Sequence, residues 1–176
     1  GHTGTLDLLA SGVLPLCFGE ATKFSQCVLN ANKSYRVSAE LGKRTTTCDR
    51  EGEITETKPV HVTRDQLLQT LDTFLGETQQ IPSMFSALKH KGQPLYKLAR
   101  KGISVLREPR TITITEIKLL DWHDSSFTLD VHCGKGTYIR NLIDDIGQAL
   151  NCGAYVSSLR RLSAGPFSAD QMLTLD

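Results

Sequence analysis

The sequence predicts an α+β domain built around a largely antiparallel sheet flanked by helices. Apolar and polar residues alternate over 34–41 and 127–133, which is the two-residue period of a half-buried strand. Apolar residues recur at the helical period over 63–76 and 137–150. These elements lack the regular strand–helix–strand order of a parallel sheet, which favours the antiparallel arrangement. With 176 residues, the chain is long enough to bury one sizeable core.

The first 29 residues predict a loop, a strand and a helix in that order. Residues 1–12, GHTGTLDLLASG, are rich in glycine and predict a loop. The short apolar run 13–18 predicts a buried strand. Residues 20–29 predict a helix with Ala21, Phe24 and Val28 on one face.

A long strand and a hairpin are expected next. Over 34–41, one face of the strand carries Tyr35, Val37, Ala39 and Leu41, and the other face carries Arg36, Ser38 and Glu40. The polar stretch 42–57 predicts the end of this strand and a hairpin loop. Asp49 and Gly52 are expected to be turn residues in that loop.

The middle of the chain predicts one clear helix and a basic loop. Thr63 is the expected N-cap of the helix and Gly76 its end. The apolar stripe of the helix is Leu67, Leu68, Leu71 and Leu75. Three helix-breaking residues, Gly92, Pro94 and Gly102, then leave room for only a short helix over 95–101.

The last third predicts two strands and a second long helix. Within the strand at 111–120, Ile112 and Ile114 face opposite to Ile117 and Leu119, so we expect a bulge. The second strand has an inner face of Phe127, Leu129, Val131 and Cys133. A Gly134-Lys135-Gly136 turn leads into a helix that Thr137 is expected to cap. The stripe of this helix is Ile139, Leu142, Ile143, Ile146 and Leu150.

The composition excludes several classes of protein. Hydrophobic residues make up 39% and charged residues 22% of the chain, and no apolar run approaches the roughly 20 residues of a membrane span. No segment resembles a signal peptide. The five cysteines (17, 27, 48, 133 and 152) form no CxxC pair, so neither a disulfide framework nor a zinc site is indicated. We therefore expect a cytoplasmic protein with reduced thiols.

Positive charge is concentrated in one segment. Seven basic residues against the single acid Glu108 lie between 84 and 110, namely Lys89, Lys91, Lys97, Arg100, Lys101, Arg107 and Arg110. A charge run alone is more often a solvated surface face. A local basic patch also holds phosphates, and Phe85, His90 and Tyr96 in the same segment are able to stack on bases.

Taken one at a time, the candidate functional residues have ordinary structural explanations. Asp7 in a glycine-rich loop is most often a turn or cap residue, and His2 has no partner at metal-ligand spacing. The pair His132-Cys133 has none either. Gly134-Lys135-Gly136-Thr137 is not a nucleotide-binding loop, because Leu129 occupies the position of the required glycine.

The side chains at the start of the last helix are similarly ambiguous. Arg140 lies off the apolar stripe and either pairs with Asp144 one turn later or reaches outward to hold a carboxylate or phosphate. Tyr35 and Tyr138 each begin an element, where a ring either packs in the core or faces a cleft.

Several segments together resemble one family. GHTGTLDLLASG, followed by VLPLCFGEATKFSQ, is similar to the signature of bacterial tRNA pseudouridine synthases of the TruB type. The same resemblance extends to SYRVSAELGKRTTTCDREG, QIPSMFSALKHKGQPLYKLARKGISV, VHCGKGTYIRNLIDDIG and VSSLRRLSAGPF. These segments occur in the family's order and span nearly the whole chain.

This resemblance implies an enzyme that isomerises uridine 55 in the T arm of tRNA to pseudouridine, with no metal or organic cofactor. It implies a mixed fold around an extended antiparallel sheet. The implied partner is tRNA, and neither a membrane nor an obligate protein partner is indicated.

The resemblance also assigns roles to individual residues. Asp7 matches the catalytic aspartate, Arg140 the arginine that pairs with it, and His2 a histidine pushed into the RNA stack. Tyr35 matches a tyrosine that stacks on the target base, and Tyr138 and Leu159 line the uracil pocket. The basic segment 82–110, with Lys89, Lys91 and Arg100, matches an insertion that clamps the T-arm loop.

Two departures from the family pattern are visible. Leu8 stands where members usually have proline, which would fix the backbone after Asp7. The chain also starts inside a family motif, so residues 1–176 are expected to be a catalytic domain without the family's opening strand and helix or its C-terminal RNA-binding module. Two alternatives are a non-catalytic RNA-binding or RNA-remodelling module and a dyskerin-like, guide-RNA-type synthase.

Overall fold

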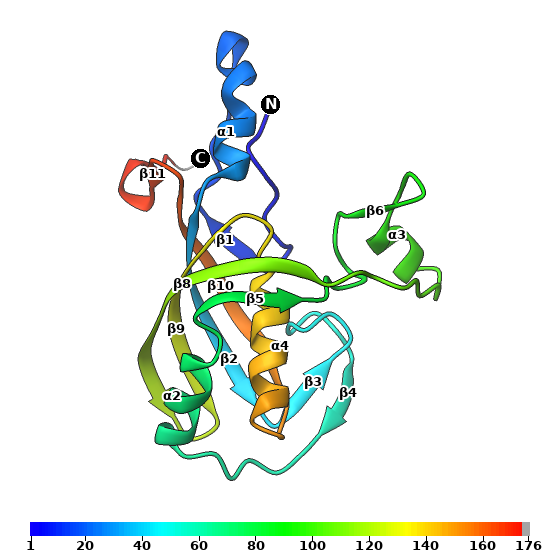
Figure 1. The fold of residues 1–176 in the computed structure, drawn as a ribbon, viewed down its shortest axis with the longest axis vertical. Helices are drawn as coiled ribbons and strands as arrows, with labels where there is room; N and C mark the ends of the chain where they lie inside the picture. The colour runs from blue at the N-terminus through cyan, green and yellow to red at the C-terminus, as the bar shows by residue number, and fades with distance from the viewer. Residues whose placement is uncertain (174–176) are drawn as a thin grey trace.

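One seven-stranded sheet forms the frame of the computed structural model, which describes residues 1–173 (Figure 1). Its strands lie in the order β1-β10-β2-β9-β8-β5, and β11 pairs with β10. They are β1 (Ala10–Gly12), β2 (Lys33–Leu41), β5 (Gly76–Gln80), β8 (Arg110–His123), β9 (Ser126–Cys133), β10 (Ala154–Ala164) and β11 (Phe167–Ser168). Every pairing is antiparallel except the short parallel one between β1 and β10. The predicted α+β class with a largely antiparallel sheet is confirmed.

Helices cover one face of the sheet. The long helix α4 (Ile139–Ala149) packs mainly on β10, and α2 (Arg64–Asp72) packs beside it against β8 (Figure 1). Fully buried Leu142 and Ile143 of α4 meet Val37 and Leu129 of the sheet in one core, where each such side chain contributes about 1.5–3 kcal/mol. A Cβ on Gly147 of α4 would lie 2.1 Å from the Ala154 nitrogen, so glycine allows this close approach of helix and strand.

The opposite face of the sheet is polar. Arg36 on β2 and Asp130 on β9 form a bidentate ion pair with both distances at 2.8 Å. The hydroxyls of Ser38 and Thr128 lie 3.0 Å apart across the same two strands. The alternation predicted for 34–41 is therefore confirmed, since its apolar residues enter the core and its polar ones make cross-strand pairs on the other face.

Smaller elements extend from the frame. They are the 3₁₀ helix η1 (Gly19–Phe24), α1 (Ser25–Asn30), the hairpin β3 (Lys43–Thr45) and β4 (Ile54–Thr57), the hairpin β6 (Lys89–His90) and β7 (Gln93–Pro94), α3 (Leu95–Ala99), and the 3₁₀ helix η2 (Ala169–Gln171). The segment 82–110, which we call the basic insertion, contains β6, β7 and α3 and stands away from the sheet in Figure 1.

Several further predictions are confirmed. Thr63 caps α2 in a reciprocal box: its side chain accepts from the Gln66 N–H at 3.2 Å, and its own N–H donates to the Gln66 side chain at 2.8 Å. The register between β8 and β9 shifts between Ile114 and Glu116, which is the expected bulge. The short helix expected in the basic segment is α3.

Four local predictions are wrong. The helix that Thr63 caps ends at Asp72 and not at Gly76, which begins β5, and Leu75 of its expected stripe is 43% exposed. Residues 13–18 form no strand, because Pro15 has no N–H for a ladder and the segment instead meets residues 1–3 through single bonds, such as Cys17 N–H to the Gly1 carbonyl at 2.8 Å. Helix 20–29 exists as η1 and α1, but its expected apolar face is not buried, since Phe24 is 66% exposed. Thr137 does not cap α4: Tyr138 is the N-cap residue, and the Thr137 hydroxyl donates to the Gly134 carbonyl at 3.0 Å to close the turn.

Candidate active site

The loop at residues 1–13 is anchored at both ends. Near its start, the N–H and the hydroxyl of buried Thr3 both reach the Pro15 carbonyl at 3.2 Å. Near its end, β1 pairs with β10, and the Val13 N–H donates to the Arg161 carbonyl at 2.9 Å. Gly12 has φ +108°, and a Cβ there would lie 2.1 Å from the Arg161 carbonyl oxygen, so glycine is required. These anchors fix the position of the intervening residues.

Asp7 lies in a turn between the two anchors. Its carbonyl accepts the Ala10 N–H at 2.9 Å, which is the turn role expected from the sequence. Its side chain does more, because it points to α4 and receives Arg140 in a bidentate pair: Nε donates to Oδ2 at 2.9 Å and Nη2 to Oδ1 at 2.8 Å. The Asp7 side chain keeps 32% of its surface exposed, whereas that of Arg140 keeps 7%. The carboxylate is thus oriented by a buried cation and still open on one side.

Arg140 uses all its N–H groups. Nη1 donates to the Thr47 carbonyl at 3.1 Å and to Asp49 Oδ2 at 3.4 Å, and Nη2 also donates to the Phe85 carbonyl at 3.1 Å. With the two bonds to Asp7, every one of the five donors of the guanidinium has a partner. The arginine therefore joins the loop 1–13, the hairpin loop after β3 and the root of the basic insertion.

Of the two alternatives that the sequence left open for Arg140, pairing with Asp144 is wrong. Asp144 instead accepts Arg44 of β3 in a bidentate pair with both distances at 2.8 Å. Arg140 follows the alternative, in which it leaves its own helix to hold a carboxylate.

A small pocket opens beside the Asp7–Arg140 pair. Its volume is about 110 Å³, and its walls include Asp7, Tyr35, Tyr138, Leu159 and Arg161. Burial raises the pKa of Tyr35 to about 12 and also raises the pKa of Tyr138. Both phenols are therefore neutral near pH 7, and they give the pocket two aromatic, uncharged walls beside the charged side chains of Asp7 and Arg161.

Tyr138 is held by a buried amide from the far edge of the sheet. The Tyr138 N–H donates to Gln80 Oε1 at 2.9 Å, and Gln80 Nε2 donates to the Tyr138 carbonyl at 3.1 Å. Gln80 is the last residue of β5, two residues before the basic insertion begins. The start of α4, which carries Arg140, is thus tied to the root of that insertion.

The other residues predicted for the site lie outside the pocket. His2 is exposed at the start of the loop, with its ring Nδ1 against the Gly4 carbonyl. Lys89, Lys91 and Arg100 are exposed on the basic insertion, and Arg100 lies over the Tyr96 ring at 5.5 Å. The structure brings Asp7, Arg140, Tyr35, Tyr138 and Leu159 together and leaves these four at a distance from the cavity.

Two buried charged residues of the site were not predicted from the sequence. Asp49 was expected only as a turn residue, and nothing in its neighbours indicates a partner 91 residues away. Arg161 lies on β10 two residues after buried Leu159 and shares its side of the strand. A charge in the inward register of a strand is a signal that points to a site, and here the sequence contains one.

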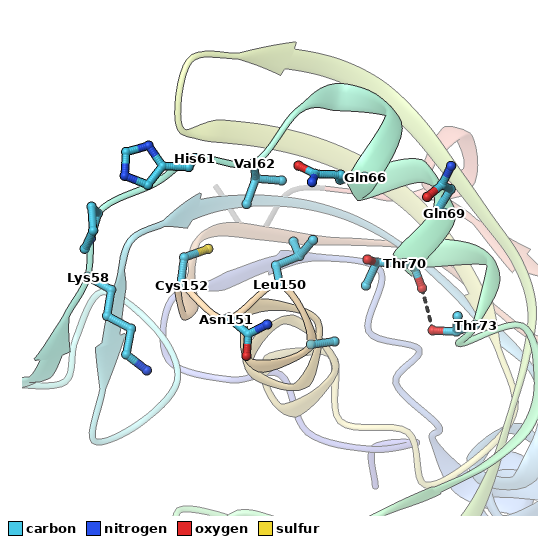
Figure 2. Close-up of a pocket in the computed structure, with 12 residues that line it drawn as sticks. Lys58, His61, Val62, Gln66, Gln69, Thr70, Thr73, Leu150, Asn151 and Cys152 are labelled. Atoms are coloured by element: carbon cyan, nitrogen blue, oxygen red, sulfur yellow. Dashed lines mark hydrogen bonds between the residues drawn. The ribbon is translucent and has the colours of Figure 1, made fainter.

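A second hollow is larger but differs in kind. A groove of about 820 Å³ lies between α2, the segment 58–62 and the end of α4 (Figure 2). Its lining includes Lys58, His61, Gln66 and Asn151, all of them exposed, and no carboxylate among the described residues. We call it the α2 groove.

The described part of the chain contains no cluster of three or more His, Cys, Asp or Glu side chains arranged to hold a metal ion. Its helices are all too short or too polar to cross a membrane. The five cysteines are free thiols, and Cys133 and Cys152 are buried.

Comparison with solved structures agrees with this architecture. The chain superimposes on a protein in the crystal structure of a Cbf5-Nop10-Gar1 complex with a TM-score of 0.76 and 33% identity, covering 99% of this chain and 43% of that one. The structure of an H/ACA RNP bound to a substrate RNA containing 2'-deoxyuridine gives a TM-score of 0.70 at 30% identity, over 99% of this chain and 41% of that one.

Sequence comparison gives closer relatives. The chain is 58% identical over 176 residues to tRNA pseudouridine synthase B of Pseudomonas syringae and covers 58% of that protein. It is 56% identical over its full length to the protein of the same name from Psychromonas ingrahamii, covering 57% of it. The chain thus spans little more than half the length of the curated relatives that it matches.

The chain has the fold of the pseudouridine synthases, and its small pocket has a carboxylate–arginine pair at its edge. Residues 1–139 match the profile of the TruB family pseudouridylate synthase N-terminal domain, and residues 140–176 match that of the tRNA pseudouridylate synthase B C-terminal domain. The chain belongs to the TruB family.

Proposed function

We propose that this chain forms the catalytic part of an enzyme that converts uridine 55 in the T arm of tRNA to pseudouridine, acting in the cytoplasm. The observation that carries the proposal is the bidentate pair between Asp7 and buried Arg140 at the edge of a pocket of about 110 Å³. The 53–58% identity to relatives named tRNA pseudouridine synthase B supports the choice of tRNA as substrate.

The reaction demands a flipped base and a group that acts at the sugar. Uracil must leave ribose at N1, turn and rejoin through C5, and a base inside a folded RNA loop is reached only by extruding it. Asp7 is the group that acts at the sugar, either by attacking it or by removing a ribose proton. Arg140 keeps the carboxylate oriented, and the exposed side of Asp7 is where the sugar approaches.

The pocket walls suit a base that has to rotate. Tyr35 offers an aromatic face, and Leu159 and Tyr138 add two further uncharged walls. None of these three side chains carries a charge that would fix one orientation of uracil. Because the product is an isomer of the substrate, the chemistry calls for no redox or group-transfer cofactor.

The exposed residues serve the rest of the RNA. His2 lies on the same loop as Asp7, and its ring is exposed. In this proposal the ring fills the gap that the flipped base leaves. The basic insertion supplies Lys89, Lys91 and Arg100 for the phosphates of the T arm. The bonds of Gln80 and Phe85 to Tyr138 and Arg140 link this insertion to the catalytic pair.

The alternatives make different predictions. A non-catalytic RNA-binding module has no use for an oriented carboxylate beside a base-sized pocket. A guide-RNA-type synthase shares the chemistry, but the identity to the chains in the Cbf5 and H/ACA complexes is 29–33%, well below that to the tRNA pseudouridine synthase B relatives.

Chemical mapping of pseudouridine on unmodified bulk tRNA tests the function. The native protein, without any guide RNA, is expected to introduce pseudouridine at position 55 and to leave a tRNA with cytidine at that position unmodified. If pseudouridine forms only when a guide RNA is added, the guide-RNA alternative is favoured. If it forms neither with nor without a guide RNA, the binding module is favoured.

A further inference from the structure

Arg161 is a buried cation with no anion beside it. It is 2% exposed, and its Nε donates to the Val13 carbonyl at 2.7 Å. Within residues 1–173, its Nη2 has no hydrogen-bond partner and no carboxylate lies within 4.0 Å of its nitrogens. Arg140, by comparison, has a partner for every N–H. Burying a charge without a counter-ion is costly, so a site that retains one is arranged for a negative charge that arrives later.

The guanidinium belongs to the wall of the small pocket. Arg161 on β10 is paired across the strands with Tyr35 on β2 and follows Leu159 by two residues, and all three line the cavity. Its charge and a hydrogen bond from its side chain also offset part of the rise in the pKa of Tyr35. The cation therefore acts at the end of the pocket where the base is expected, whereas Arg140 is committed to Asp7.

The proposed function supplies a negative charge at this place. When the C1'–N1 bond breaks, its electron pair leaves with uracil, and the charge spreads over N1, O2 and O4 of the detached base. The anion then reattacks C1' through C5, and the proton on C5 is lost. A fixed positive charge in a water-poor pocket stabilises such an intermediate without reorganisation.

We propose that Arg161 supplies the positive charge that stabilises the departing uracil anion, an inference that rests on the proposed function. A phosphate is a poorer candidate for this role, because the guanidinium is 2% exposed and the exposed cations of the chain lie on the basic insertion. The competing explanation is that Arg161 only anchors the loop of Asp7 through the Val13 carbonyl.

Two bases of different leaving ability separate these explanations. Fluorine at C5 withdraws electrons and stabilises the uracil anion, so base detachment from 5-fluorouridine depends less on Arg161. The experiment uses T-arm stem-loops with uridine or 5-fluorouridine at position 55 and the native protein in excess. Single-turnover loss of the original nucleoside is measured after digestion by liquid chromatography, which separates uridine from pseudouridine although the two have the same mass.

Arg161→Gln is expected to slow detachment of uracil by about 10²-fold or more, the range found when one charge-stabilising donor is removed. For 5-fluorouracil the expected loss is several-fold smaller. Arg161→Lys keeps the charge and is expected to return the ratio of the two rates close to that of the wild type. The ratio does not depend on what fraction of a variant is folded.

Arg160→Gln is the matched control. Arg160 is the neighbouring residue and is exposed, and its substitution changes the net charge by the same amount. It should leave both rates unchanged. Equal losses for the two bases in Arg161→Gln, or no detachment of 5-fluorouracil by either Arg161 variant, would overturn the inference and leave Arg161 as a loop anchor. Wild-type protein that forms no pseudouridine would instead refute the proposed function, which keeps the two failures apart.

Discussion

The two hollows of this molecule differ in what surrounds them more than in size. The α2 groove has about seven times the volume of the small pocket, yet its polar side chains are mostly exposed. The hydrogen bond drawn in Figure 2 is a local one, from the Thr73 hydroxyl to the Thr70 carbonyl. The small pocket is lined by the Asp7 carboxylate and the buried Arg161 guanidinium, and the buried Arg140 guanidinium lies beside it. Converging buried charge, and not volume, marks the place where chemistry is expected.

The difference also lies in how each hollow is assembled. The α2 groove forms where one helix, one connecting segment and one helix end happen to adjoin. The small pocket brings together Asp7 from the N-terminal loop and Arg140 from α4, which are 133 residues apart. Arg140 adds contacts to the hairpin loop and the basic insertion, so four segments meet at one side chain. Such an arrangement restricts many residues at once, which is expected only where function requires it.

Removing the cation of the pair has the largest expected effect. Arg140→Met leaves Asp7 without its bidentate partner and Asp49 buried without a counter-ion, and we expect pseudouridine formation to fall by about 10³-fold or more. The measurement is the single-turnover rate on a T-arm stem-loop.

Arg44→Met is the control for that substitution. It breaks a similar bidentate pair with α4, at Asp144, outside the pocket. A rate within a few-fold of the wild type is expected, so similar losses in the two variants would mean that Arg140 acts only through stability.

The expected effect of Asp49→Asn is intermediate. The amide keeps the shape of the carboxylate but loses its charge, so Arg140 is held less firmly from the side opposite Asp7. We expect the single-turnover rate to fall by about one to two orders of magnitude, with RNA affinity nearly unchanged. Rate and Kd are measured on the same stem-loop, and a rate equal to the wild type would show that Asp7 alone fixes the arginine.

Neutralising the basic insertion has the smallest expected effect on chemistry. In a Lys89→Gln, Lys91→Gln, Arg100→Gln variant, binding should weaken and the salt dependence of log Kd should flatten by about 0.7–0.9 per lost phosphate contact. The rate at saturating RNA should change little. Lys58→Gln in the α2 groove is the control and should keep the full slope. An unchanged slope in the triple variant would identify the basic segment as a solvated surface.

The regular parts of the fold were predictable from the sequence. β2 and β9 each bury one face, and α2 has a capping box, so their periodicity is visible in the residues. β10 was not predicted, because register shifts at Val156/Ser158 and Arg161/Ser163 interrupt its two-residue alternation. Residues 13–18 were misassigned, because an apolar run alone does not distinguish a strand from a segment with an exposed Phe18.

The site depended on resemblance more than on pattern. Asp7, Arg140 and Tyr35 each have an ordinary local explanation, and only the family's motifs bring them together in the sequence. Their contacts join residues far apart in the chain, which local periodicity does not encode. Asp49 and Arg161 were missed for the same reason. Arg161 stands out as an inward-facing charge only once β10 is recognised as a strand.

The central claim is that the small pocket, through Asp7, isomerises uridine 55. The most direct test compares Asp7→Asn with His61→Ala, a variant in the α2 groove. Pseudouridine in one T-arm stem-loop is counted by the mass shift that a pseudouridine-specific derivatisation produces. The account predicts that Asp7→Asn forms no detectable pseudouridine while its RNA affinity stays close to that of the wild type, and that His61→Ala has normal activity. Near-normal turnover by Asp7→Asn would contradict the account.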